Sequence, residues 1–369
     1  MILECLRYWV TYYRVDGFRF DLASILGRNE DGCPMNKPPL IQSLAFDPIL
    51  GKVKLIAEAW DAGGLYQVGS FPSWNRFSEW NGKYRDDLRK FLKGDSGMAK
   101  VAAARITGSE DLYDPNIRGR NASVNFFTCH DGFTLYDLYS YNVKHNEANG
   151  WNNTDGESNN HSWNCGAEGE TDNTDILRLR KRLMRNAFAV LMASRGTPMF
   201  LAGDEFCNTQ FGNNNAYCQD NIVSWLDWNR LDQNADIFAF FQYMIAFRKA
   251  HIVLRKNTKP CSLGFPFVSY HGINPWNTDY QREDHYIGIL YAGRDEKDQK
   301  DDIVYVAVNT YWEAQSVILP QIPESRQWKK AVDTFKMDGK TEYSPEEKDS
   351  VFNNQTLLQP RSVQILVVE

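Results

Sequence analysis

Residues 14–23 read RVDGFRFDLA, a short stretch that combines apolar residues with two acids and two bases. Alternation along a strand sends Arg19 and Asp21 to one face and Phe18 and Phe20 to the other. A charge inside a sheet that is covered on both faces is costly unless it is paired or used, so this pair needs an explanation. The stretch therefore predicts a strand that ends in functional side chains.

Segments of this kind recur up to about residue 250, and helical patterns separate them. We expect strands at 17–23, 53–60, 77–81, 122–131 and 197–205 and helices at 40–46, 85–92, 97–106, 176–196 and 236–251. Repeated strand–loop–helix units indicate a parallel α/β sheet. Four of these strands end in polar or acidic residues, and in a (β/α)8 barrel the active site is built at that end.

The pattern changes near residue 260, where short β runs follow one another without helices between them. These runs are HYIGILYAG (285–293), DIVYVAVNTYW (302–312), QSVILPQI (315–322) and SVQILVVE (362–369). We therefore expect two domains, a (β/α)8 barrel part over residues 1–257 and an all-β sandwich domain over residues 258–369.

Composition excludes several classes of protein. The 369 residues carry 41 basic and 47 acidic side chains with no basic block, which argues against nucleic acid as a partner. The seven cysteines form no C-x-x-C pair, a usage typical of free thiols in a reducing cytoplasm. No apolar run is long enough for a membrane span, and the start lacks the features of a secretory signal. Aromatic residues make up 14%, enough for an ordinary core and for platforms that stack on sugars.

Three acids stand at the ends of three expected strands: Asp21, Glu58 and Asp131. Arg19 beside Asp21 should lower the pKa of that carboxyl, which suits a nucleophile. The apolar neighbours of Glu58 should raise its pKa, which suits a proton donor. Asp131 follows His130, and both can hold a sugar hydroxyl. Two carboxyls about 5 Å apart, one nucleophilic and one acid/base, define a retaining glycosidase.

Taken alone, each feature has an ordinary structural explanation. Arg19 and Asp21 would form a structural ion pair, and Glu58 would be a surface acid at a strand end. The sequence CHD at 129–131 would suggest a metal site, but no second ligand cluster lies at a matching spacing. Other catalytic classes lack support, since the chain has no G-x-S-x-G, P-loop or G-x-G-x-x-G motif. Three acids at strand ends in one chain favour the glycosidase.

These motifs also carry a resemblance to a known family. GFRFDLA (17–23), LIAEAWD (55–61) and NFFTCHDGFTLYDL (125–138) resemble the second, third and fourth signature regions of the α-amylase superfamily of glycoside hydrolases, family 13. Residues 140–172 and the stretch GTPMFLAGDEF…GNNNAYCQDNIVSWLDW (196–228) resemble its isoamylase and bacterial glycogen-debranching branch. The resemblance runs through nearly all of residues 1–230 and is weaker in the all-β tail.

The resemblance implies a role for each candidate. Asp21 would be the nucleophile, Glu58 the general acid/base, and Asp131 the residue that holds the hydroxyls of the distorted sugar. Arg19 would orient and ionise Asp21, and His130 would contact the same sugar.

The resemblance also implies a ligand. The substrate would be a branched α-glucan (glycogen, amylopectin or a limit dextrin) cut at its α-1,6 branch points, with no cofactor and no metal. Trp60 and Trp80 are assigned to substrate binding, and loop 140–174 is expected to set the preferred chain length.

One departure from the family matters. Its first signature region, a strand ending in Asp followed by Asn-His, is missing here, so the barrel strands would be the fourth to the eighth. Five strands cannot close a barrel. We therefore expect a C-terminal portion whose further partner is the missing N-terminal part of the barrel. Two other functions stay open: a 4-α-glucanotransferase that uses the same acids, and a non-catalytic glucan-binding fragment.

Overall fold

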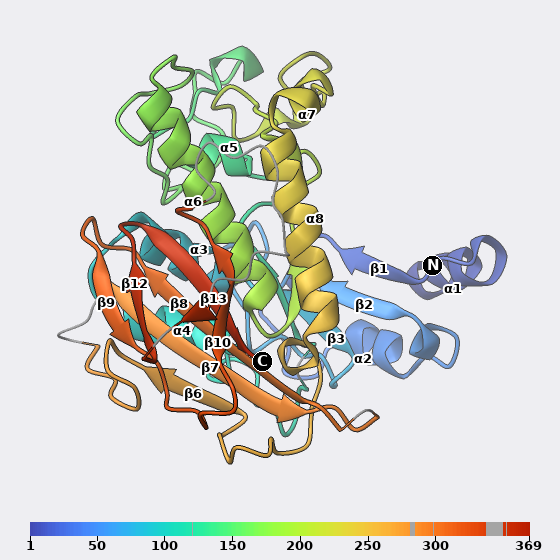
Figure 1. Cartoon of the computed structure of the whole chain (residues 1–369). Coiled ribbons are helices and arrows are strands. Elements are labelled where there is room, and N and C mark those ends of the chain that lie inside the picture. Colours follow the sequence, from blue (N-terminus) through green and yellow to red (C-terminus); the bar gives the residue numbers. More distant parts are fainter. Residues whose placement is uncertain (120, 281–284, 298, 337–349, 352) are drawn as a thin grey trace. The chain divides into compact units, whose positions relative to one another are not determined.

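A computed structural model describes residues 1–119, 121–280, 285–297, 299–336, 350–351 and 353–369 (Figure 1). Its contacts divide the chain into two compact units. The first unit consists of Met1–Tyr84, Gly108–Phe126 and Gly196–Pro198. The second unit consists of Arg85–Thr107, Phe127–Arg195 and Met199–Glu369.

The first unit is built on a sheet of five strands in the order β1-β2-β3-β4-β5. The strands are β1 (Gly17–Phe20), β2 (Lys54–Ala57), β3 (Phe77–Trp80), β4 (Ser123–Phe126) and β5 (Thr197–Met199). The pairs β1/β2, β2/β3 and β3/β4 are parallel. The expected parallel α/β sheet is therefore confirmed.

Each strand is shorter than its sequence pattern suggests. β1 ends at Phe20, directly before Asp21, and β2 ends at Ala57, directly before Glu58. Of the strand expected at 197–205, only β5 forms, and Asp204–Phe206 is a 3₁₀ turn. Asp21 and Glu58 thus occupy the first loop position after their strands, where the side chain is not confined to one face of the sheet.

Helices α1 (Ile2–Tyr13) and α2 (Pro39–Phe46) belong to the first unit. Leu3, Leu6 and Val10 follow one another at helical spacing and pack together against the core of this unit. Tyr13, at the end of the helix, is 58% exposed. Its ring instead packs on Trp9, with the ring centroids 4.6 Å apart.

The second unit holds the remaining helices. They are α3 (Gly82–Lys93), whose first residues lie in the first unit, α4 (Ala99–Ile106), α5 (Leu135–Leu138), α6 (Thr174–Ala193), α7 (Asn229–Gln233) and α8 (Ala235–Ala250). Asn173 caps α6 by accepting hydrogen bonds from the Asp175 and Ile176 backbone nitrogens. α6 packs against α8 (Figure 1), where Phe188 and Phe241 stack with centroids 3.5 Å apart.

Two antiparallel sheets follow in the second unit, as expected for a sandwich. The larger has the strand order β11-β10-β13-β8-β7-β6, and the smaller pairs β12 with β9. The strands are β6 (Val268–His271), β7 (Tyr286–Arg294), β8 (Asp301–Asn309), β9 (Gln315–Ile318), β10 (Trp328–Asp333), β11 (Ser350–Val351), β12 (Gln355–Leu358) and β13 (Ser362–Val368). The sequence pattern missed β10 because two lysines and a register shift between Lys330 and Val332 break its alternation.

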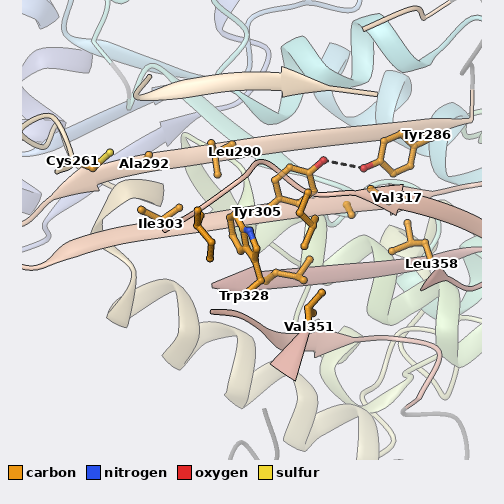
Figure 2. Packing of buried hydrophobic residues seen from close by; sticks show 14 residues of the cluster. Cys261, Tyr286, Leu290, Ala292, Ile303, Tyr305, Val317, Trp328, Val351 and Leu358 are labelled. Carbon is orange, nitrogen blue, oxygen red and sulfur yellow. Dashed lines mark hydrogen bonds between the residues drawn. The ribbon is translucent and has the colours of Figure 1, made fainter. Parts of the chain in front are cut away.

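The core of the sandwich contains Trp328, Tyr286 and Tyr305 (Figure 2). Trp328 is fully buried, and its indole nitrogen donates to the Pro320 carbonyl oxygen at 3.0 Å. The hydroxyls of Tyr286 and Tyr305 share a hydrogen bond of 3.0 Å. The large buried rings therefore keep their polar atoms satisfied.

Helix α6 is bound directly to this sandwich. Asn186 donates from its amide to the Arg361 carbonyl oxygen at 2.9 Å and accepts from the Thr334 hydroxyl at 2.6 Å. Residues on both sides of position 257 thus share one compact unit, and the expected domain boundary after 257 stays a prediction. In the described part of the chain, no helix has both the length and the apolar character that crossing a membrane requires.

Replacing Trp328 with Ala should lower the free energy of unfolding by about 3–5 kcal/mol, because it leaves a cavity and an unpaired carbonyl. Urea unfolding followed by circular dichroism measures this. The exposed Trp312 gives a matched control, and Trp312→Ala should stay within about 0.5 kcal/mol of the parent. Equal effects of the two changes would contradict the central place of Trp328.

Candidate active site

The guanidinium of Arg19 joins the two acids that follow β1 and β2. Its Nη1 lies 2.5 Å from Oδ1 of Asp21, and its Nη2 lies 2.9 Å from Oε1 of Glu58. The parallel register pairs Phe20 with Ala57, so the next residues, Asp21 and Glu58, stand at the same level. The structure thus brings three of the predicted site residues together at the carboxyl end of the sheet.

The two carboxylates differ in exposure. The Asp21 side chain is 70% exposed, whereas that of Glu58 is 6% exposed. Glu58 also accepts a hydrogen bond from the Leu22 backbone nitrogen at 2.7 Å. The apolar chain neighbours of Glu58 are thus joined by a charged one, because the strand register gives Glu58 the same cation as Asp21.

Two tryptophans near these acids have different surroundings. Trp80 is only 9% exposed, and the Arg19 guanidinium lies 4.2 Å from the centroid of its ring. Trp60 is half-buried and stacks on Tyr66, with centroids 6.0 Å apart and planes within 10°. Trp80 thus holds Arg19 in place, and direct sugar contact by either ring stays a prediction.

His130 and Asp131 lie in the second unit, in the loop that follows β4. Both side chains are exposed, and His130 Nε2 lies 3.4 Å from Asp131 Oδ2. These two residues form a cluster of their own with hydrogen-bond donors and acceptors open to solvent.

A buried acid that sequence reasoning missed holds this loop. Asp204 is 1% exposed and accepts hydrogen bonds from the Thr128 hydroxyl and from the Leu135 backbone nitrogen, the latter at 2.8 Å. Thr128 and Leu135 flank the segment that carries His130 and Asp131. Burial raises the pKa of Asp204 to about 7. The two acids that end the expected strand at 197–205 were the available signal, but the hydrogen-bond partners of Asp204 are distant in the sequence.

Within the described ranges, no group of three or more His, Cys, Asp or Glu side chains is arranged to hold a metal ion. The described carboxylates and the His130 imidazole can transfer protons, attack as nucleophiles or form hydrogen bonds.

Known structures show the class of fold. Pullulanase from Anoxybacillus sp. LM18-11, solved with maltotetraose, matches with a TM-score of 0.66 over 99% of this chain and 46% of that chain, at 20% identity. The fold is thus that of an α/β barrel-like part followed by a β-sandwich. No protein-family model matches the chain.

Sequence comparison is more specific. The chain is 46% identical to isoamylase 3, chloroplastic, of Oryza sativa subsp. japonica over 335 residues, which are 90% of this chain and 41% of the relative. It is 54% identical to the glycogen operon protein GlgX homolog of Mycobacterium tuberculosis over 257 residues, 69% of this chain and 35% of the relative.

The chain is therefore a homologue of isoamylases and GlgX proteins, and its resemblance to the isoamylase type of the α-amylase superfamily is confirmed. It spans less than half the length of these curated relatives.

Replacing Arg19 with Met should lower the free energy of unfolding by about 1–3 kcal/mol, because Glu58 loses its cation while it stays buried. Arg178→Met is a matched control, since Arg178 and its partner Asp175 are mostly exposed and such a pair contributes about 0–1 kcal/mol. Urea unfolding of both variants checks this, and a loss no larger than that of the control would contradict it.

Asp204 predicts a pH-dependent stability. A carboxyl whose pKa is raised to about 7 by burial stabilises the folded protein most at low pH, and this stabilisation is lost as pH rises through about 7. Asn copies the neutral acid and does not titrate. The stability of the parent minus that of Asp204→Asn should therefore shrink between about pH 4 and pH 7. Thermal unfolding across this range measures it, with the exposed Asp175→Asn as control, and a constant difference would exclude the buried titration.

Proposed function

We propose that this chain carries the catalytic acids of a debranching glycoside hydrolase that cuts α-1,6 branch linkages of α-glucans. The observation that carries the proposal is the shared guanidinium of Arg19, which holds Asp21 and Glu58 side by side at the ends of neighbouring parallel strands. Homology to isoamylases and GlgX proteins supports the choice of linkage and substrate. Glycogen, amylopectin and limit dextrins are the expected substrates.

The exposed Asp21 is the nucleophile in the proposed double displacement. Its carboxylate attacks the anomeric carbon while the bond from that carbon to the leaving oxygen breaks, and Glu58 donates its proton to that oxygen. The product is a covalent glycosyl-enzyme and a shortened glucan. Glu58 then takes a proton from water, the water oxygen bonds to the anomeric carbon, and Asp21 is released. The two inversions retain the α configuration.

The remaining residues bind the sugar. Arg19 positions both acids through its two ion pairs. Asp131 and His130 offer an exposed acceptor and donor for hydroxyls of the reacting sugar, where bonds that strengthen in the transition state lower the barrier. Trp60 is the expected stacking platform, and the reaction uses no cofactor.

We infer that the five strands correspond to the fourth to eighth strands of the barrel. β1 lies at an edge of the sheet, and the adjoining helix α1 exposes Tyr8, Trp9, Tyr12 and Tyr13. The relatives are more than twice as long as the matched part, which supports a further barrel part as the partner of this edge. A cytoplasmic location stays a prediction from the seven free cysteines, since the rice relative is named as chloroplastic.

Asp21→Asn and Glu58→Gln should each lower hydrolysis of glycogen branch points by at least about 10²-fold, because each removes a group that reacts or transfers a proton. The assay counts the new reducing ends that are released from glycogen by this chain and by a version extended by the coding sequence before residue 1. Asp175→Asn removes an exposed carboxylate elsewhere and should leave the rate unchanged.

Near-normal turnover in either variant would overturn the roles of the two acids. Product analysis separates the functions: hydrolysis yields short linear chains with new reducing ends, whereas a glucanotransferase yields elongated chains. If the extended protein releases no oligosaccharide from glycogen, the debranching function is wrong.

A further inference from the structure

The loops that follow β1 and β2 are joined by an ion pair to which the proposed reaction gives no role. Arg28 follows the 3₁₀ turn Ala23–Gly27, seven residues after Asp21, and Asp61 lies three residues after Glu58. Arg28 donates from its Nε to Asp61 Oδ2 at 2.7 Å and from its Nη2 to Asp61 Oδ1 at 3.0 Å. One guanidinium thus binds both oxygens of the carboxylate, a geometry that fixes orientation as well as distance.

Asp61 is also fixed within its own loop. Its side chain is 1% exposed, and Oδ1 accepts a further hydrogen bond from the Leu65 backbone nitrogen at 3.2 Å. The Asp61 backbone nitrogen in turn donates to the Leu65 carbonyl oxygen at 3.0 Å. The hydrogen bonds from Arg28 hold the pKa of the Asp61 carboxyl below its usual range. Arg28 therefore binds a buried, charged group that is part of the turn after β2.

Gly63 leaves space for the guanidinium of Arg28. A Cβ built at Gly63 would lie 3.1 Å from Arg28 Nη2 and 3.2 Å from Asp61 Oδ1, closer than side chains usually pack. A methyl group at this position would therefore push against both members of the pair. Arg28 also donates from its Nη1 to the Gly32 carbonyl oxygen at 2.5 Å, so all three nitrogens of the guanidinium form hydrogen bonds.

The loop after β1 needs support, because its backbone is strained directly after Asp21. Leu22 adopts φ 41° and ψ 46°, the left-handed region that a leucine seldom occupies. Such a conformation persists only where its surroundings hold it. The Leu22 and Ala23 backbone nitrogens donate to Oε2 and to the carbonyl oxygen of Glu58, at 2.7 and 2.9 Å. The two loops are thus joined next to the acids by these hydrogen bonds, and a few residues further on by the pair of Arg28 with Asp61.

We propose that Arg28 and Asp61 are positioning residues, which hold the loops of Asp21 and Glu58 at the separation that the double displacement needs. The catalytic consequence rests on the proposed function, whereas the coupling of the two loops does not. In a retaining enzyme the two carboxyls stand about 5 Å apart, and a displacement of about 1 Å can lower the rate about 10²-fold. The Asp21 side chain is 70% exposed, so its position depends on the backbone that carries it.

A second ion pair of the first unit provides a matched control. Arg7 donates to Asp47 Oδ2 from its Nε at 2.8 Å and from its Nη2 at 2.5 Å, and the Asp47 side chain is also 1% exposed. This pair joins α1 to the segment after α2. Arg7→Met and Arg28→Met each leave a buried carboxylate without its cation, so both should destabilise the fold to a similar extent. A purely structural role of Arg28 therefore predicts the same behaviour for both variants.

Hydrogen–deuterium exchange of this chain, measured by mass spectrometry on peptides that cover residues 21–27, tests the coupling without an activity assay. In Arg28→Met these amides should exchange at least about 10-fold faster than in the parent, because the loop leaves its contacts with Glu58 more often. Arg7→Met should exchange there as the parent does. Arg28→Lys keeps the charge but loses the paired hydrogen bonds, so its rate should lie between those of Arg28→Met and the parent.

The same variants, made in the version extended before residue 1, measure the effect on hydrolysis of glycogen. Arg28→Met should lower kcat about 10- to 100-fold and change KM less than about 2-fold, because misplaced acids slow the reaction of a glucan that still binds. Arg7→Met should keep the kcat of the parent. Gly63→Ala, a smaller change that pushes against the pair, should lower kcat in the same direction. If Arg28→Met does not fold, Arg28→Lys and Gly63→Ala carry both tests.

Three results decide the proposal. If Arg28→Met exchanges at residues 21–27 no faster than Arg7→Met, the coupling of the loops is wrong, whether or not the protein hydrolyses glycogen. If exchange rises but kcat equals that of Arg7→Met, the pair holds the loops without positioning the acids, and the proposal is overturned. If exchange rises as expected but the extended parent does not hydrolyse glycogen, the coupling stands, while the debranching function and its catalytic consequence fail.

Discussion

The ion pairs of Arg19 with Asp21 and Glu58 are the constraint on which the site in the first unit depends. Parallel strands in register bring their carboxyl ends to one level, so two acids that follow neighbouring strands meet there. Two carboxylates that contact the same group repel each other unless that group is a cation. A guanidinium is suited to this place, because its planar fork offers separate nitrogens to the two acids and its face to an aromatic ring, here that of Trp80.

In the second unit, side-chain hydrogen bonds hold long loops in one conformation. The segment from residue 140 to 173 has little regular structure, yet its amides bond to the segment around Asn214. Asparagine suits this task, because one side chain supplies both donors and acceptors and copies the pairing of a backbone amide. Asp204 acts in the same way on the loop of Asp131, as a buried acceptor for a hydroxyl and for backbone nitrogens.

Much of the fold follows from local patterns in the sequence. Apolar runs before Asp21 and Glu58 predict β1 and β2, and regular helical spacing predicts α6, because these signals lie within a few residues of each other. That Asp21 and Glu58 share Arg19 could not be predicted, since it depends on the register between β1 and β2, which a long connection separates. The role of Asp204 was hidden for the same reason, because its partner Thr128 lies 76 residues earlier in the chain. Strand β10 was not predicted, because its register shift breaks the alternation by which a strand is recognised in a sequence.

The amide pairs between Asn146, Asn160 and Asn214 carry no charge. Such bonds do not titrate where carboxylates and histidines do, and salt does not screen them as it screens ion pairs. In a double displacement the acid/base carboxyl changes protonation state twice in every cycle, whereas loops held by amide pairs keep their charge and their conformation. Mutation can therefore change these loops without changing the charges of the acids, so the loops and the acids can evolve separately.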